Sequence, residues 1–250
     1  MVRSRIIPSL LLKGEILVKT VNFSDRTIYV GDPINAVRIF SELKVDELCL
    51  FDIQKRKQGL SPNFSLLGKI AKNARMPLCY GGGIRSASDA INLVNLGFEK
   101  ISISYSGVQD CSVSIINDLI DKIGGQSVVI TLDVVRIIEN GYTLYKVRYN
   151  NKNKMELYDL DGVLLILKQH AIAEIIINDV DREGGNIGID TELLEQALKG
   201  IDCHLTILGG AQSHSEIASL AQKYSPIGIA AASVFTFTGK HRAVLLNYIK

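Results

Sequence analysis

Eight short apolar runs, separated by segments of helical periodicity, constrain the fold of this chain more than any other feature of its sequence. Continuous runs of β-branched and other apolar residues bounded by turn residues are typical of parallel strands covered on both faces. Several intervening segments, such as 33–44, 86–97 and 191–200, open with a capping residue or a proline. Strict alternation over eight units favours a closed (β/α)8 TIM barrel over the alternative, a doubly wound open sheet. The predicted strands are 5–12, 47–53, 77–82, 100–106, 127–135, 174–180, 205–210 and 227–235.

The size and charge of the chain set the class of protein. A length of 250 residues with 47% hydrophobic residues suits one barrel, so we expect a single domain over residues 1–250. The formal net charge of +2 favours neither a nucleic acid nor an anionic membrane as partner, so any anionic ligand has to be held locally. The N-terminal apolar stretch is too short for a signal peptide, and no segment reaches the ~18 apolar residues of a membrane span. We therefore expect a cytoplasmic protein.

The cysteines and histidines show no metal-ligand spacing. The cysteines are far apart with no CxxC motif, so they are predicted to be small buried hydrophobes rather than a metal site or a disulfide. No histidine ends a predicted strand, and the GGGIRS segment at 81–86 does not match a dinucleotide-binding fingerprint. We expect no metal and no cofactor. The residues considered are Cys49, Cys79, Cys111 and Cys203, with His170, His204, His214 and His241.

The sequence repeats itself at half its length. The segment GGGIRS at 81–86 returns as LGGAQS at 208–213, and KISISYS at 100–106 returns as GIAAASV at 228–234. Repeats of this length predict two four-unit half-barrels that face each other. Such a barrel would carry two matching anion sites at opposite edges of one mouth.

Glycines at the ends of predicted strands are the candidate phosphate sites. At Gly81–Gly83 and Gly209–Gly210, backbone N–H groups could approach a phosphate at the start of the following helix. The alternative is that these glycines only form tight turns. Ser233, with Ala232, adds a hydroxyl at the mouth of the eighth strand, where barrels commonly bind phosphate.

Carboxylates at strand ends are the candidate acid and base groups, because chemistry in barrels occurs at that face. Asp52 ends the second strand and Asp133 the fifth, while Asp179, Asp181 and Glu183 crowd the end of the sixth. Each could instead be a solvated turn residue. Asp133 is the strongest candidate, because it closes a purely apolar run.

Two segments depart from compact alternation. Lys19 lies among apolar residues in a predicted loop after the first strand, and the alternative is an ordinary surface lysine. Residues 140–160 are polar but alternate like a strand at 143–149, which predicts a surface hairpin on the catalytic face. Residues 150–154 would form its flexible tip.

Taken in order, these motifs resemble the cyclase subunit of imidazole glycerol phosphate synthase across essentially the whole chain. In that family a glutaminase partner releases ammonia, which passes through the barrel and reacts with a two-phosphate ribulosyl substrate. The resemblance therefore implies a lyase in a heterodimer with a glutaminase, acting on a phosphorylated small molecule. The segments that carry it are 5–23, 31–33, 46–53, 81–86, 125–133, 181–184, 209–211 and 231–235.

The resemblance also assigns roles to individual residues. It implies that Asp133 is the general acid or base and that Lys19 closes over the substrate, with Asp52 as a further catalytic candidate. The phosphate-binding candidates are Gly82, Gly83, Ser104, Gly184, Gly210, Ala232 and Ser233. A charged ring at the bottom of the barrel, through which ammonia enters, would comprise Arg5, Glu47, Lys100 and Glu174. Positions near the partner surface are Glu99 and Gln126.

Three departures from the family pattern fall at the substrate end. Where the family has an aspartate at the end of the first strand, this chain has Leu11, which can neither take nor give a proton. Tyr105 would place a bulky phenol where a small hydroxyl meets phosphate. The segment 178–184, NDVDREG, replaces the usual TSxDRDG.

The intact ring and altered substrate end leave several hypotheses. The chain could be a cyclase of histidine biosynthesis in which Asp133, Asp52 or Asp179 compensates for Leu11. It could be a paralogue that delivers ammonia to a nucleotide-sugar precursor, as in the amidino-sugars of surface polysaccharides. A non-catalytic partner that only activates a glutaminase, and an unrelated phosphate-binding isomerase barrel, are further alternatives.

Overall fold

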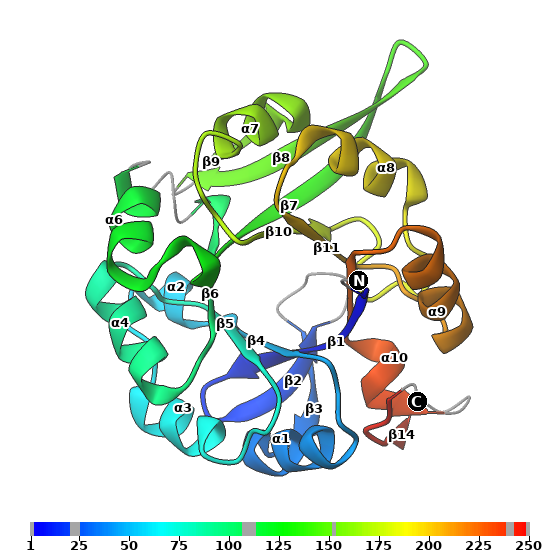
Figure 1. Ribbon diagram of the computed structural model, residues 1–250. Coiled ribbons are helices and arrows are strands. Elements are labelled where there is room, and N and C mark those ends of the chain that lie inside the picture. The colour runs from blue at the N-terminus through cyan, green and yellow to red at the C-terminus, as the bar shows by residue number, and fades with distance from the viewer. Residues whose placement is uncertain (1–2, 21–25, 107–113, 152–153, 239–242, 249–250) are drawn as a thin grey trace.

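Eight parallel strands close into a barrel in the computed structural model, which describes residues 3–20, 26–106, 114–151, 154–238 and 243–248 (Figure 1). β1 pairs with both β4 and β12, and β7 pairs with β10, so the parallel ladder has no free edge. The predicted TIM barrel is confirmed, and the open doubly wound sheet is wrong. The barrel strands are β1 (Arg5–Lys13), β4 (Leu48–Asp52), β5 (Leu78–Gly81), β6 (Lys100–Ser104), β7 (Val128–Glu139), β10 (Glu174–Asp179), β11 (His204–Leu208) and β12 (Gly228–Ala231).

Helices form an outer layer around the barrel (Figure 1). Their N-termini are fixed by capping side chains from the sequence, among them Asp32, Asn63, Asp159 and Asp190. No helix within these described segments has the length and apolar character needed to cross a membrane. The helices are α1 (Pro33–Glu42), α2 (Lys55–Gln58), α3 (Phe64–Ala71), α4 (Ala87–Leu96), α6 (Ser114–Ile123), α7 (Leu160–Leu167), α8 (Thr191–Gly200), α9 (His214–Lys223) and α10 (Ser233–Thr236), with a short 3-10 turn at Gly125–Ser127.

Matching hydrogen bonds support the half-barrel repeat. Ser86 caps α4 by accepting from the Asp89 N–H, and Ser213 caps α9 in the same way from the Glu216 N–H. The Asp89 carboxylate accepts from the N–H four residues earlier, and so does the Glu216 carboxylate. The two halves therefore share capping chemistry as well as sequence.

The first strand of each half continues beyond the barrel into a three-stranded antiparallel sheet. β1 pairs with β2 (Ile16–Thr20), which pairs with β3 (Thr27–Gly31). β7 pairs with β8 (Tyr142–Asn151), which pairs with β9 (Lys154–Asp159). The second sheet contains the predicted hairpin, and its first turn projects beyond the helices in Figure 1.

Strands β2 and β3 were not predicted, and the expectation that Lys19 lies in a loop is wrong: Lys19 lies in β2 and is 4% exposed. The turn between β7 and β8 has positive φ at Asn140 and Gly141, as a two-residue hairpin turn requires. The predicted tip at 150–154 is where β8 meets β9, and residues 152–153 fall outside the described residues. Near the C-terminus, β13 (Phe237–Thr238) pairs with β14 (Ala243–Val244).

Two apolar layers hold the barrel together. One lies between strands and helices, and the other lines the lumen with Ile7, Cys49, Cys79, Val129, Ile176, Leu208 and Ala230, against which Phe51 packs. Cys49 and Cys79 are fully buried, as predicted for small hydrophobes, and Cys203 is half-buried. Cys111 and His241 lie outside the described residues.

Candidate active site

Alternation along the strands decides which side chains enter the lumen. On β7, Val129 belongs to the lumen layer while Val128 and Ile130 belong to the outer core, so Asp133 points inward. On β10, Ile176 belongs to the lumen layer, so Asn178 also points inward. Asp133 and Asn178 are paired in register on neighbouring strands. Asn178 lies near the end of β10, and Asp133 lies where β7 leaves the barrel to pair with β8, so both are at the face at which barrels carry out chemistry.

A hydrogen bond joins these two side chains. The Asn178 amide Nδ2 donates to Asp133 Oδ1 at 2.7 Å. The Asn178 Oδ1 atom is buried and, among the described residues, has no hydrogen-bond partner. An unsatisfied buried acceptor of this kind costs about 1–3 kcal/mol. Asn178 was not singled out from the sequence, although its two-residue spacing from Glu174 through Ile176 would have placed it on the inner face.

The end of β1 is apolar. Leu11 shares the inner face with Ile7 and is paired in register with Phe51 of β4 and Val18 of β2. Within the eight strands, all of which are described, Asp133 is therefore the one inward-facing carboxylate above the bottom ring. General acid–base chemistry that needs two opposed carboxylates lacks its second member here.

A buried ion pair joins strand β2 to the loop that follows β10. The Lys19 ammonium on β2 contacts the Glu183 carboxylate that follows β10. Their side chains are 5% and 12% exposed. The pair links the first hairpin to the loop after the sixth barrel strand.

Asp52 and Asp179 each accept hydrogen bonds in the turn that follows their strand, and their side chains point away from the lumen. Each side chain is on the outer face of its strand, the same face as the outer-core residue two positions before it, which is Leu50 for Asp52 and Ile177 for Asp179. Asp52 Oδ1 accepts from the backbone N–H groups of Gln54 and Lys55 at 3.0 and 3.2 Å. Burial raises the pKa of Asp52, in spite of these backbone donors.

Asp179 is the counterpart of Asp52 in the second half. Its Oδ1 accepts from the Arg182 N–H at 3.3 Å, three residues ahead, as Asp52 does from Lys55. Burial first, and then the neighbouring charge of Asp190, raise the pKa of Asp179 to about 6. Asp181 is also used structurally, because its Oδ2 accepts from the Arg136 N–H at 2.7 Å.

Two glycine turns allow the backbone to pack tightly at the two proposed phosphate edges. A Cβ on Gly82 would lie 2.5 Å from the Asp52 carbonyl oxygen, and one on Gly209 would lie 2.6 Å from the Asp179 carbonyl oxygen. Gly83 and Gly210 also have positive φ and equally close neighbours. The first edge lies near the end of β6 with Ser104, and the second lies near the end of β12 with Ala232 and the buried Ser233.

Gly184 and Tyr105 are two further residues that were expected at a phosphate site. Gly184 lies in the turn after β10 with a φ of +77°. The Tyr105 phenol belongs to the outer core and packs edge-on against Tyr158, with ring centroids 6.0 Å apart. The expectation that it would project into a phosphate site is therefore wrong.

Four charged side chains form an alternating ring at the bottom of the barrel. Arg5 contacts Glu47 and reaches Glu174 at 2.9 Å, and Lys100 lies 2.7 Å from both carboxylates. Thr206 also donates to Glu174, a contact not foreseen from the sequence. Glu47 and Glu174 are 3% and 1% exposed, so each buried anion is matched by two cations.

The ring charges control one another's protonation. Burial opposes ionisation of Lys100, but Glu174 and Glu47 outweigh it and raise the Lys100 pKa. Burial would likewise raise the Glu174 pKa, but Lys100 and Arg5 reverse the effect and lower it. Lys100 and Glu174 therefore stay charged over the ordinary pH range.

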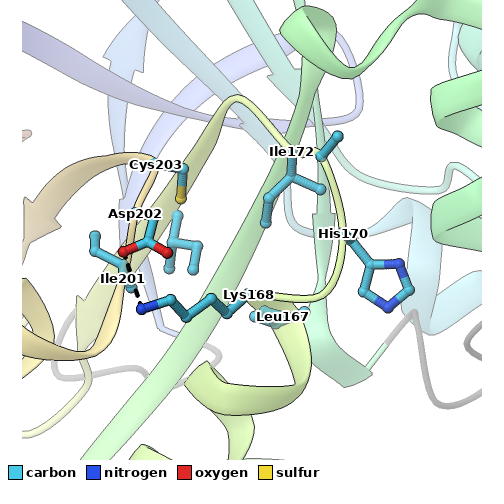
Figure 2. Close-up of a pocket in the computed structure, with 9 residues that line it drawn as sticks. Leu167, Lys168, His170, Ile172, Ile201, Asp202 and Cys203 are labelled. Carbon is cyan, nitrogen blue, oxygen red and sulfur yellow. Dashed lines mark ion pairs between the residues drawn. The ribbon is translucent and has the colours of Figure 1, made fainter.

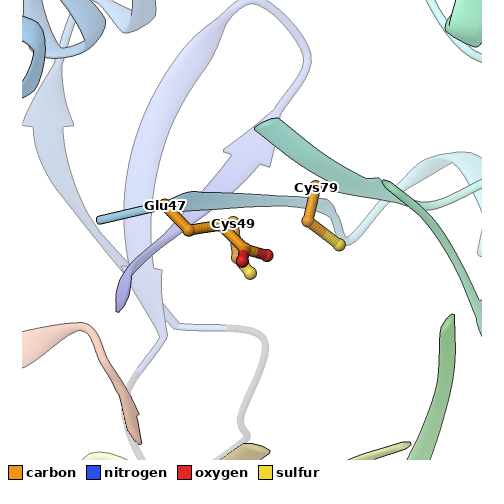
Figure 3. Close-up of side chains that lie close together, drawn as sticks. All are labelled: Glu47, Cys49 and Cys79. Atoms are coloured by element: carbon orange, nitrogen blue, oxygen red, sulfur yellow. The ribbon is translucent and has the colours of Figure 1, made fainter. Parts of the chain in front are cut away.

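Above the ring, two thiols lie beside Glu47 (Figure 3). A Glu47 oxygen and the sulfurs of Cys49 and Cys79 are within 4.8 Å of one another. The hydrogen bond to Cys79, and then burial, raise the Cys49 pKa well above its usual range, so this thiol remains protonated. Since Glu47 already pairs with Arg5 and Lys100, the group forms part of the lumen wall.

A cavity of about 220 Å³ lies at the opposite end from Asp133, between the loops that precede β10 and β11 (Figure 2). It is bordered by Lys168 and Asp202, whose charged groups are 2.9 Å apart. Glu99 and Gln126 are exposed in the described structure near this end of the barrel. This face carries the expected partner positions.

Comparisons with known proteins agree with this geometry. The family model described as "Histidine biosynthesis protein" matches residues 5–242. A Pseudomonas aeruginosa protein is 40% identical over 99% of this chain and 96% of its own length, and a Leptospira borgpetersenii protein is 39% identical over the same shares. Both are provisionally named as an imidazole glycerol phosphate synthase subunit, HisF. A Streptococcus mutans protein that bears this name without qualification is 28% identical over 95% of this chain and 92% of its own length.

Proposed function

Because this chain belongs to the histidine biosynthesis protein family, we propose that it is the ammonia-using subunit of a glutamine amidotransferase complex. A glutaminase would dock at the bottom of the barrel, and a phosphorylated acceptor would bind at the mouth. The observation that supports this proposal best is the charged ring of Arg5, Glu47, Lys100 and Glu174 at one end of a lumen whose other end carries Asp133.

The lumen between ring and mouth suits neutral ammonia. It is lined by apolar side chains and by the Cys49 thiol, which stays protonated. Transfer of an ammonium ion into such a setting without a counter-ion is costly, whereas ammonia carries no charge. A lumen of this kind would deliver ammonia while excluding water and ions.

At the mouth, Asp133 would act as the general base or acid during addition of ammonia to the acceptor. Asn178 holds one carboxylate oxygen and offers its own buried oxygen to the ligand. The glycine turns at Gly82 and Gly210, together with Ser104 and Ser233, would hold phosphate at the two edges. Lys19, which lies in the first hairpin, would screen the negative charge of the bound phosphate.

With Leu11 in place of a carboxylate, the site favours amination over a ring closure that needs two opposed carboxylates. We therefore propose that the acceptor is not the two-phosphate ribulosyl substrate. It is a sugar-phosphate precursor, such as a nucleotide-sugar precursor of amidino-sugars. The second candidate is the cyclase of histidine biosynthesis itself, which the full-length similarity to HisF relatives favours.

Formation of a complex with a glutaminase tests this proposal directly. The purified chain is mixed with the glutaminase of the same organism, and glutamine hydrolysis and complex formation are measured. We expect a stable heterodimer and faster hydrolysis, with Gln126→Arg at the bottom face weakening the complex at least tenfold. Glu139→Arg at the distant hairpin tip is the matched control and should leave it unchanged. Absence of a complex, or equal effects of the two variants, would refute the proposal.

A further inference from the structure

The two proposed phosphate edges of the mouth are built alike. An added Cβ on Gly83 would lie 2.6 Å from the Lys55 Cβ, and one on Gly210 would lie 3.0 Å from the Arg182 Cβ. The backbone N–H of each of these basic residues donates to the aspartate that ends the preceding barrel strand. Lys55 and Arg182 therefore occupy equivalent positions beside the two glycine turns, so the charges around the two edges can be compared directly.

The loops that border the two edges differ in charge. The loop after β4, residues 53–63, holds three basic residues and no acidic one, and all three basic residues belong to α2. The loop after β10, residues 180–190, holds one basic residue and three acidic ones. Beyond the glycine turns, Arg85 occupies the position that Gln212 has in the second half, because the N–H of each donates to the carboxylate four residues later.

Local partners enlarge this difference. Arg182 lies 3.5 Å from the carboxylates of both Asp179 and Asp190, so the basic residue of the second loop is already neutralised. Lys55 forms no ion pair within the part of the chain that the structure describes. The carboxylates that accept from the two turns are matched, with two at each edge, so they do not offset the difference.

The same backbone therefore carries a basic edge and an acidic edge. Backbone N–H groups at a glycine turn and at the start of the following helix can hold one phosphate without further charge. The added positive charge of α2 and Arg85 suits a second phosphate joined to the first, because clustered charges of one sign concentrate the field that attracts an opposite charge. At the second edge, the three acidic residues of the loop disfavour any negative charge beyond that of one phosphate.

We propose that the first edge is a diphosphate subsite. The acceptor then binds with its diphosphate between the Gly82–Gly83 turn and α2, and with its less highly charged end at the Ser233 edge. The carbon that reacts with ammonia lies between the two ends, above Asp133. The acceptor is therefore a diphosphate ester of a sugar, not a compound with a phosphate monoester at each end. This inference rests on the proposed function for the role of the mouth as the acceptor site.

Calorimetric binding of inorganic phosphate and inorganic pyrophosphate to the full chain, at low ionic strength, tests the subsite. Pyrophosphate should bind about tenfold more tightly than phosphate, and Lys55→Gln should lower the pyrophosphate affinity by about fivefold. Lys69→Gln removes the same charge from the exposed last turn of α3, towards the bottom of the barrel, and should leave the pyrophosphate affinity unchanged. Arg182→Gln, at the equivalent position of the second edge, should also leave it unchanged.

Equal affinities for the two anions would overturn the subsite. So would equal losses from Lys55→Gln and Lys69→Gln, or a greater loss from Arg182→Gln than from Lys55→Gln. Thermal unfolding checks that each variant is folded, and the comparison of Lys55→Gln with Lys69→Gln stands even where loss of the Arg182 ion pairs impairs folding. The chain is measured alone, so loss of complex formation with the glutaminase would refute the proposed function, whereas the pyrophosphate affinities judge the subsite separately.

Discussion

The Asn178 amide donates a 2.7 Å hydrogen bond to the Asp133 carboxylate, and the two residues are paired in register across β10 and β7. One carboxylate oxygen of Asp133 is thereby fixed, while the buried Asn178 Oδ1 is left with an unmet acceptor. A single oriented carboxylate and an adjacent amide oxygen form the polar centre of a mouth whose β1 side is apolar.

Substitutions of Asp133 and of Asp52 should have different effects, the first on the reaction rate and the second on stability. Asp133→Asn should lower amination of the acceptor by about 10²- to 10⁴-fold without loss of stability, because it removes a proton-transfer group at the lumen mouth. Asp52→Ala should instead lower the free energy of unfolding by about 0.5–2 kcal/mol, because two backbone donors lose their acceptor. Steady-state rates and urea unfolding of both variants check this. A rate loss from Asp52→Ala as large as that from Asp133→Asn would restore Asp52 as a catalytic candidate.

The bottom ring predicts a defined pH dependence of stability. Because the Glu174 pKa is lowered in the folded chain, its contribution is present above the ordinary value of 4.5 and is lost as the pH falls through the folded value. Because the Lys100 pKa is raised, its contribution is present below 10.5 and is lost only at higher pH.

Glu174→Gln should therefore destabilise the chain by about 3 kcal/mol near pH 7, since two buried cations lose a shared anion. The difference from the natural chain should shrink below pH 4.5. Denaturant unfolding at several pH values measures it, and a difference that is unchanged at acid pH would show that the Glu174 charge is not what stabilises the ring.

Asp179 should affect the pH dependence of stability in the opposite direction to Glu174. Its pKa of about 6 exceeds the ordinary 3.8, so the folded state loses stability as the pH rises from about 3.8 to about 6 and this carboxyl ionises. Asp179→Asn keeps an acceptor for the Arg182 N–H and should raise the free energy of unfolding at pH 8 by about 1–3 kcal/mol. The gain should vanish towards pH 4. A variant that is less stable at pH 8 than the natural chain would mean that the ion pair with Arg182 outweighs burial.

The glycine turns offer a matched comparison of the two halves. Gly82→Ala and Gly209→Ala would each force a Cβ to within 2.6 Å of a carbonyl oxygen at positive φ, so both should impair folding and phosphate binding to a similar extent. Gly141→Ala in the hairpin turn has positive φ but no neighbour within 4 Å, and should cost only about 1–2 kcal/mol. Thermal unfolding of the three variants distinguishes steric conflict from backbone strain alone.

Much of this architecture is encoded locally and was predicted. The eight barrel strands follow from uninterrupted apolar runs, and the half-barrel repeat follows from segments that also share capping bonds at Ser86 and Ser213. The alternating ring followed from the resemblance, and the structure brings its four members together.

What escaped prediction depends on orientation and on contacts between distant segments. Strand β2 was missed because its pairing with β1 is a tertiary contact, which moved Lys19 from an expected loop into a buried ion pair with Glu183. Asp52 ends β4 and Asp133 lies where β7 leaves the barrel, but Asp52 is one position out of phase with the inner face. The Tyr105 ring was misplaced for a similar reason, because its side chain turns into the outer core.

The central claim is that this barrel receives ammonia but does not carry out the family's two-carboxylate ring closure. Turnover of the two-phosphate ribulosyl substrate by the purified chain with excess ammonium salt, beside Leu11→Asp, tests it most directly. The account predicts no formation of imidazole glycerol phosphate by the natural chain, and at most partial recovery by Leu11→Asp. Formation of that product by the natural chain at a rate comparable to that of a family cyclase would contradict it.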